Sequence, residues 1–129
     1  MGIWSRRTAL ALFGALALGA PSAASPPGKF TTVYIVANVP DGTGNVFITG
    51  NIPNLGPWNP SGALMYRDGK RRIYALEAQP GFVFEYKFTL GYWESEALGE
   101  DGKPMTQNYR VIVGSQQVYQ HNIPGFKHR

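Results

Sequence analysis

Hydrophobic and polar residues alternate along this chain in short runs, and no ten-residue window has the 3.6-residue period of an amphipathic helix. Because side chains alternate between the two faces of a strand, these runs predict β-strands. Asp-Gly and Pro-Gly turn signals stand between them. The predicted strands are residues 30–39, 46–49, 64–67, 72–78, 82–90, 92–96, 109–113 and 118–123. Short strands at this spacing are typical of an antiparallel β-sandwich of about seven to eight strands.

The run 82–90 shows the alternation most clearly. One face carries only aromatic and aliphatic side chains, which are those of Phe82, Phe84, Tyr86, Phe88 and Leu90. This face is predicted to lie in the core, so Lys87 must point out of the sandwich from a stiff strand. The same argument turns Tyr109 inward and leaves Asn108 outward.

The first 24 residues have the organisation of an export signal and are set aside from the fold. Arg6 and Arg7 precede an apolar run over residues 9–20, and Ser22-Ala23-Ala24 supplies a cleavage site. The paired arginines fit a twin-arginine signal as well as an ordinary one. The apolar run is too short to cross a bilayer, so no membrane association is expected after cleavage. We expect a periplasmic or extracellular domain over residues 25–129, which is 129 − 24 = 105 residues.

The net charge limits the kinds of partner that this domain can bind, and the cysteine content limits how it can be stabilised. The whole chain has a net charge of +4, and removal of Arg6 and Arg7 leaves +2, which is too small to indicate nucleic acid. The remaining basic cluster is best explained as a solvated hairpin tip, and it consists of Arg67, Lys70, Arg71 and Arg72. The chain has no cysteine. The exported domain must therefore be stable through packing alone.

The loop over residues 50–60 raises the functional question. Its three prolines exclude a helix interior or a central strand, so Trp58 is held on a loop. Trp93 follows the central strand, and Lys87 and Asn108 are candidate hydrogen-bonding groups nearby. Two indole faces with ammonium and amide groups suit a sugar, whose ring has apolar faces and a hydroxyl rim. From spacing alone, two half-buried tryptophans at the edge of the sandwich remain the alternative.

The ordered set of these residues resembles a known family. Gly50-x4-Leu55-Gly56-x-Trp58, Phe84-Glu85-Tyr86-Lys87-Phe88, Trp93-Glu94-Ser95, Asn108 and Val111 are similar to a starch-binding domain of carbohydrate-binding module family 20, and to the related family-48 glycogen-binding domains. The resemblance extends over residues 30–113. It implies an immunoglobulin-like sandwich that binds alpha-1,4-glucans such as starch, glycogen or maltodextrin. By position, Trp58 and Trp93 would stack on glucose, while Lys87 and Asn108 would bind its hydroxyls.

The chain departs from the fungal members of that family in two places. Trp93 comes only six positions after Lys87, and an insert over residues 97–106 separates it from Asn108. This spacing is closer to the glycogen-binding domains of AMP-activated protein kinase beta subunits, and to domains ahead of bacterial esterase-like hydrolases. Thr43 and the short 67–72 turn do not supply the second glucan site of the fungal type. We therefore expect one site, an alpha-glucan or maltooligosaccharide as ligand, and a separate hydrolase as a further partner.

The sequence offers less support for two other functions. An enzyme is poorly supported, because Glu94 and Glu96 are better explained as solvated carboxylates on one strand face, and His121 and His128 have no nucleophile beside them. No metal-ligand cluster is present, since residues 100–103 lack the spacing of a calcium loop, and no cofactor is expected. The alternative is an exported protein-interaction module that has lost glucan binding. Exposed tryptophans beside Lys87 would favour sugar binding, whereas a buried one would favour the interaction module.

Overall fold

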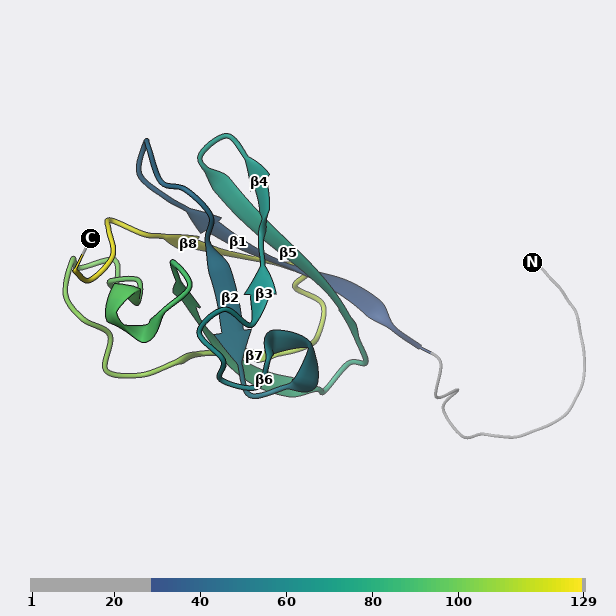
Figure 1. Cartoon of the computed structure of the whole chain (residues 1–129). Helices are drawn as coiled ribbons and strands as arrows, with labels where there is room; N and C mark the ends of the chain where they lie inside the picture. The colour runs from purple at the N-terminus through teal and green to yellow at the C-terminus, as the bar shows by residue number, and fades with distance from the viewer. Residues whose placement is uncertain (1–28, 129) are drawn as a thin grey trace, which may run out of the picture.

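The computed structural model describes residues 29–128, and the predicted signal peptide over residues 1–24 lies outside them. Two four-stranded sheets pack face to face as a β-sandwich (Figure 1). Two single-turn 3₁₀ helices, η1 and η2, lie in the loops. The elements are β1 (Thr31–Asn38), β2 (Phe47–Gly50), η1 (Pro53–Leu55), β3 (Ala63–Leu64), β4 (Tyr66–Asp68), β5 (Arg71–Ala78), β6 (Val83–Thr89), η2 (Trp93–Ser95), β7 (Tyr109–Ile112) and β8 (Val118–Asn122).

The strand order confirms the predicted β-sandwich. One sheet has the order β4-β5-β1-β8 and the other β3-β2-β6-β7. Neighbouring strands are antiparallel except β8, which runs parallel to β1 at the sheet edge. Within residues 29–128 no helix is long and apolar enough to cross a membrane.

The core is formed by the inward faces that the alternation predicts. Phe84, Tyr86 and Phe88 of β6 are fully buried, and Val33 and Ile35 of β1 meet them from the other sheet. The prediction that Phe82 lies in the core is wrong, because Phe82 precedes β6 at one end of the sandwich and is 41% exposed. The opposite face of β6 is therefore free to present Glu85 and Lys87 outward.

A polar contact joins the two sheets inside this core. The Tyr86 hydroxyl on β6 lies 2.6 Å from the Nε2 atom of His121 on β8. The His121 ring lies against Tyr109, with 3.9 Å between ring centroids. Burial lowers the pKa of His121 to about 4, although the nearby Glu100 carboxylate acts in the opposite direction. His121 is therefore neutral in the folded domain at pH 7.

We expect acidification to destabilise the domain through His121. The histidine pKa is about 4 in the fold against an ordinary 6.5, so the unfolded chain binds more protons between these values. Stability is full above pH 6.5 and is lost as the pH falls toward 4. Because the ring is only partly buried, the loss should be about 1 to 2 kcal/mol.

Urea unfolding at pH 7 and pH 4 measures this loss. The His121→Gln variant should show the smaller dependence on pH, because its amide cannot take up a proton. The His128→Gln variant, which changes an exposed residue, should behave as the wild type. Equal pH dependence of His121→Gln and the wild type would contradict this assignment.

One prediction about the basic hairpin tip is wrong. Arg72 is not solvated but only 1% exposed. Its guanidinium group donates hydrogen bonds to the carbonyl oxygens of Thr43, at 2.7 Å, and Gly69, at 2.8 Å. The sequence pattern gave the wrong prediction because Arg72 lies on the inward face of β5. There, backbone carbonyl groups of two turns accept the hydrogen bonds that water would accept at the surface. Arg71 remains exposed and forms an ion pair with Asp68.

Candidate functional site

The loop between β2 and β3 holds Trp58 in a fixed place. Leu55 is fully buried and anchors η1 in the core. The backbone N–H of Trp58 donates to the Gly50 carbonyl oxygen at 2.7 Å, and the Thr89 hydroxyl donates to the carbonyl oxygen of Pro60 at 2.5 Å. Trp58 has a φ of +57°, a left-handed conformation that favours glycine. The loop therefore keeps an unfavourable backbone geometry at the residue whose ring it presents.

Lys87 lies on the outward face of β6, opposite Thr49 of β2. Its ammonium group donates to the Oε2 atom of Glu96. The predicted outward direction of Lys87 is confirmed, but the side chain is only 19% exposed and ion-paired. A strand places the Cβ atom accurately, and the ion pair then fixes the end of a flexible side chain.

Trp93 begins η2 rather than lying on a strand, so the predicted strand over residues 92–96 is wrong. Ser95 explains the turn, because its fully buried hydroxyl donates to the Tyr92 carbonyl oxygen at 2.6 Å and accepts the N–H of Leu90 at 2.9 Å. A serine that bonds its local backbone in this way favours a turn over a strand. Trp93 is 39% exposed as a result.

The expectation that Glu94 and Glu96 are solvated carboxylates on one strand face is also wrong. Glu94 is exposed, but Glu96 is 13% exposed and forms the ion pair with Lys87. Glu94 lies in η2 and Glu96 directly follows it, so the two carboxylates do not share a strand face.

Asn108 precedes β7 and is oriented by its neighbour on β6. Its side-chain Nδ2 donates to the Oε1 atom of Glu85 at 2.8 Å. Glu85 is itself held by Asn51, whose Oδ1 accepts the Glu85 backbone N–H at 2.9 Å. The amide oxygen of Asn108 has no hydrogen-bond partner among residues 29–128, so it is available to accept a hydrogen bond from a ligand.

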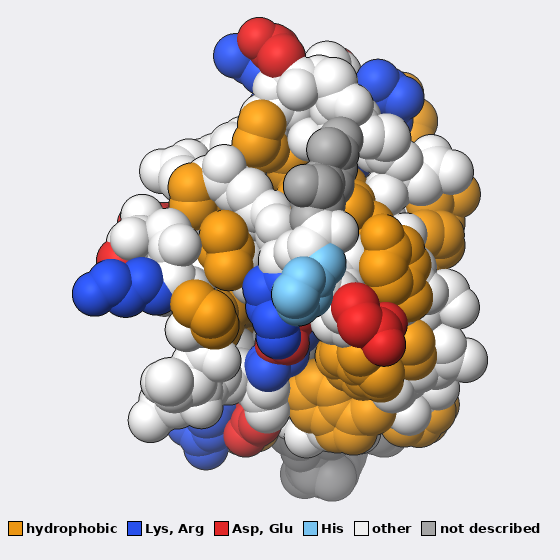
Figure 2. Space-filling view, turned by 60° about the vertical axis from the view of Figure 1, so that its left-hand side comes forward, with side chains coloured by type: hydrophobic (Ala, Val, Ile, Leu, Met, Phe, Trp, Pro, Cys, Tyr) orange, Lys and Arg blue, Asp and Glu red, His pale blue; other side chains and the backbone are white. Residues whose placement is uncertain are grey.

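These side chains line one open hollow of about 180 Å³, formed by Trp58, Lys87, Trp93, Glu96 and Asn108. We call these five residues the tryptophan site. The structure brings together all four residues predicted from the sequence. Figure 2, which brings forward the side of the molecule that carries the C-terminus, shows basic and acidic side chains beside a broad hydrophobic area. Two indole rings with an ammonium group and a free amide oxygen can stack on a sugar ring and bind its hydroxyls.

Glu96 was not predicted as a site residue, and neither was its second partner. The Lys127 ammonium lies 3.6 Å from the Oε1 atom of Glu96. The nine-residue separation of Lys87 and Glu96 matches no helical or strand spacing. Only the turn at η2 and the return of the C-terminal segment bring these charges together.

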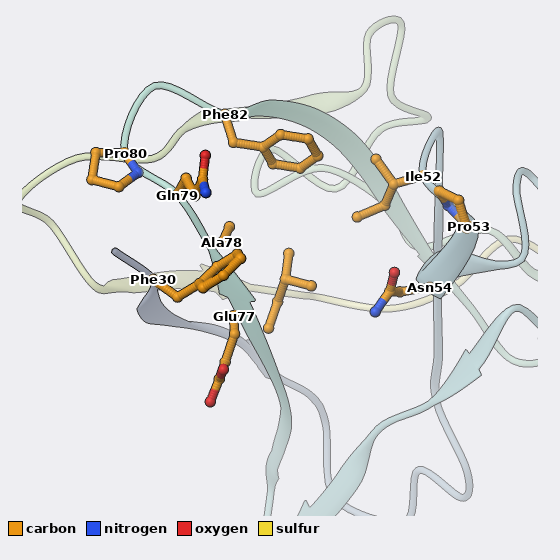
Figure 3. Close-up of a pocket in the computed structure, with 10 residues that line it drawn as sticks. Phe30, Ile52, Pro53, Asn54, Glu77, Ala78, Gln79, Pro80 and Phe82 are labelled. Atoms are coloured by element: carbon orange, nitrogen blue, oxygen red, sulfur yellow. The ribbon is translucent and has the colours of Figure 1, made fainter. Parts of the chain in front are cut away.

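A larger hollow of about 350 Å³ lies at the end of the sandwich where β1 begins (Figure 3). Phe30, Ile52, Pro53 and Phe82 line it, and the side chain of Glu77 points away from it. Its lining includes polar residues such as Asn54, Glu77 and Gln79, but no indole and no ammonium group. It is therefore the poorer candidate for a sugar. In the described part of the chain, no His, Cys, Asp or Glu side chains gather in a group of three or more that could hold a metal ion.

Comparison with known proteins relates this geometry to a family. The family described as starch binding domain matches residues 31–103, which is 73 of the 129 residues. Such domains are non-catalytic binding modules for starch-type polysaccharides. The match includes Trp58, Lys87, Trp93 and Glu96 but ends before Asn108. No sequence among curated proteins matches the chain.

Two solved structures are similar to this chain. The family 15 glycoside hydrolase glucoamylase from Hypocrea jecorina is 19% identical, with a TM-score of 0.52 over 84% of this chain and 19% of that chain. The gamma-CGTase from alkalophilic Bacillus clarkii is 23% identical, with a TM-score of 0.48 over 78% of this chain and 16% of that chain. The chain thus spans less than a fifth of either protein. The likeness to the glucoamylase concerns the fold alone.

Proposed function

The chain belongs to the starch binding domain family, and from this membership we propose that it is a non-catalytic module that binds alpha-1,4-glucans at the tryptophan site. The observation that carries the proposal is the convergence of Trp58, Lys87, Trp93 and Asn108 on one hollow. Family membership supports a starch-type ligand. The geometry of the hollow supports the place where it binds.

The two indoles would stack on neighbouring glucose units of the glucan. The ammonium group of Lys87 has three N–H donors, and the Asn108 oxygen is an acceptor. Together they can bind one sugar hydroxyl that accepts a hydrogen bond and another that donates one. Because the site is small and the oligosaccharide loses flexibility on binding, the Kd should be roughly micromolar to millimolar.

Exposure of Trp93 supports sugar binding over a protein-interaction module that has lost the glucan site. Neither tryptophan is buried, since Trp93 is 39% exposed and Trp58 is half-buried, and both line the same hollow as Lys87. Titration with maltoheptaose while tryptophan fluorescence is recorded tests the proposal. A saturable change is expected with maltoheptaose and none with the beta-linked cellohexaose. No change with either sugar would count against glucan binding.

Replacing Lys87 with alanine should weaken maltoheptaose binding by about 1 to 2 kcal/mol, the scale of a lost charged hydrogen bond. Isothermal titration calorimetry measures this loss. The exposed Lys70, whose ammonium lies 3.9 Å from Asp41, offers a control, and Lys70→Ala should bind as the wild type. Equal affinity of Lys87→Ala and the wild type would mean that Lys87 is only a surface charge.

The cellular context is part of the same proposal. The leader over residues 1–24 supports export to the periplasm or the cell exterior, where alpha-glucan would be met. A module without its own catalytic groups would hold a separate hydrolase near its substrate or retain the glucan itself. Cell fractionation with an antibody against the domain tests export, and retention in the cytoplasm would contradict it.

A further inference from the structure

Glu96 lies between two lysines from distant parts of the sequence. Its Oε2 atom accepts a hydrogen bond from the ammonium group of Lys87, and its Oε1 atom lies 3.6 Å from that of Lys127. The Glu96 side chain is 13% exposed, and those of Lys87 and Lys127 are 19% and 33% exposed. Partly buried charges interact more strongly than fully solvated ones, because water screens them less.

The C-terminal segment 125–127 is bound to the residues around Glu96 by its backbone as well. The Lys127 N–H donates to the Glu96 carbonyl oxygen at 2.9 Å, and the Leu98 N–H donates to the Gly125 carbonyl oxygen at 3.0 Å. Between them the Phe126 side chain is only 7% exposed. In Figure 1 the yellow C-terminal segment accordingly lies beside the green loop that follows β6. This segment therefore packs against Glu96, one of the residues that line the tryptophan site.

We propose that Glu96 is a positioning residue for Lys87, and that the C-terminal segment 125–127 is part of the binding site because it holds Glu96 in place. The inference rests on the proposed function and concerns the same site. A lysine side chain has a flexible four-carbon stem, so an unpaired ammonium would be spread over many positions. Pairing one of its three N–H groups with Glu96 fixes the ammonium and leaves two N–H groups for sugar hydroxyls.

Calorimetric titration of the full chain with maltoheptaose tests this proposal. Glu96→Gln keeps the size of the side chain and removes its charge, and it should weaken binding about tenfold, the effect of one charged hydrogen bond. Lys127→Met keeps both Glu96 and Lys87 but removes the second ion pair that holds the Glu96 side chain. It should weaken binding about threefold. Matched controls are Glu77→Gln and Lys70→Met, which change exposed residues of the other sheet and a distant turn, and both should bind as the wild type.

A double-mutant cycle separates positioning from a merely structural role. If Glu96 acts through Lys87, then Glu96→Gln should cost nothing further once Lys87→Met is present, and the double variant should bind as Lys87→Met does. If Glu96 only keeps the η2 turn folded, its replacement should weaken binding by the same factor in both backgrounds. Such additivity would overturn the proposal.

Failure of this inference can be told from failure of the proposed function. Binding by the wild type together with wild-type affinity of both Glu96→Gln and Lys127→Met would overturn the positioning role while leaving glucan binding intact. Absence of binding by the wild type would overturn glucan binding itself. Urea unfolding of each variant checks that it is folded, and Lys127→Met provides the test should Glu96→Gln prove unstable.

Discussion

The Trp58→Ala variant is expected to lose detectable maltoheptaose binding while the domain remains folded. The Trp58 ring forms one wall of the hollow, and losing its contact with a sugar should cost about 2 to 3 kcal/mol, the scale of an aromatic side chain covered by a partner. For a Kd near the middle of the expected range, about 100 µM, this loss raises the Kd to several millimolar or more, which calorimetry does not detect. Calorimetry with maltoheptaose measures the loss, and circular dichroism measures the fold.

The backbone of Trp58 supplies a second variant that removes the ring. Its φ of +57° is unfavourable for alanine as well as for tryptophan, whereas glycine adopts it readily. Trp58→Gly should therefore lose binding equally, with an unfolding free energy at least as high as that of Trp58→Ala. The ring is not part of the core cluster, so neither variant should unfold. Folded variants with wild-type affinity would remove Trp58 from the site.

The Gly62→Ala variant should lose both stability and glucan affinity. A Cβ atom at Gly62 would lie 2.2 Å from the carbonyl oxygen of Leu55 and 3.0 Å from that of Ile48. Both are backbone atoms and the closer one belongs to η1, so residue 62 and η1 must move apart, at a cost of about 3 kcal/mol, the upper part of the range for overpacking. Because Leu55 anchors the loop that carries Trp58, the indole should be displaced with it. Urea unfolding and maltoheptaose titration measure the two effects.

Gly44 provides the matched control for this substitution. A Cβ atom there meets no other atom within 4 Å, and the residue lies in the turn between β1 and β2. Gly44→Ala should therefore change the unfolding free energy by less than about 0.5 kcal/mol. If Gly62→Ala were as stable as Gly44→Ala, the close packing of Gly62 against the Leu55 backbone would be refuted.

Most of the fold could be predicted from alternation alone. The strand that contains Phe84 and Phe88 has one hydrophobic face and one polar face. Because side chains alternate along a strand, only one orientation buries the hydrophobic face. The segment 92–96 failed because its composition suits a strand, while the hydroxyl of Ser95 stabilises a turn that alternation does not reveal. The parallel pairing of β8 with β1 depends on where the tail returns, which no local pattern encodes.

Some residues of the tryptophan site could be predicted from the sequence and others could not. Trp58, Lys87, Trp93 and Asn108 could be named in advance because they stand in ordered motifs near strand ends. Glu96 and Lys127 could not, since their roles arise only when residues 31 positions apart come together. Arg72 shows the opposite error, in which a charge in a basic cluster is buried because turn carbonyls surround it. Sequence patterns thus indicate candidate residues for a binding site, whereas tertiary contacts determine how these residues are held.

Retention of the protein on insoluble starch, with cellulose as the control, is the most direct test of glucan binding. Selective retention on starch is expected, with release by soluble maltoheptaose and loss of retention in Trp58→Ala. No retention on starch, together with no fluorescence change on addition of maltoheptaose, would refute glucan binding at the tryptophan site. The sandwich would then serve another purpose, and a protein partner would become the leading hypothesis.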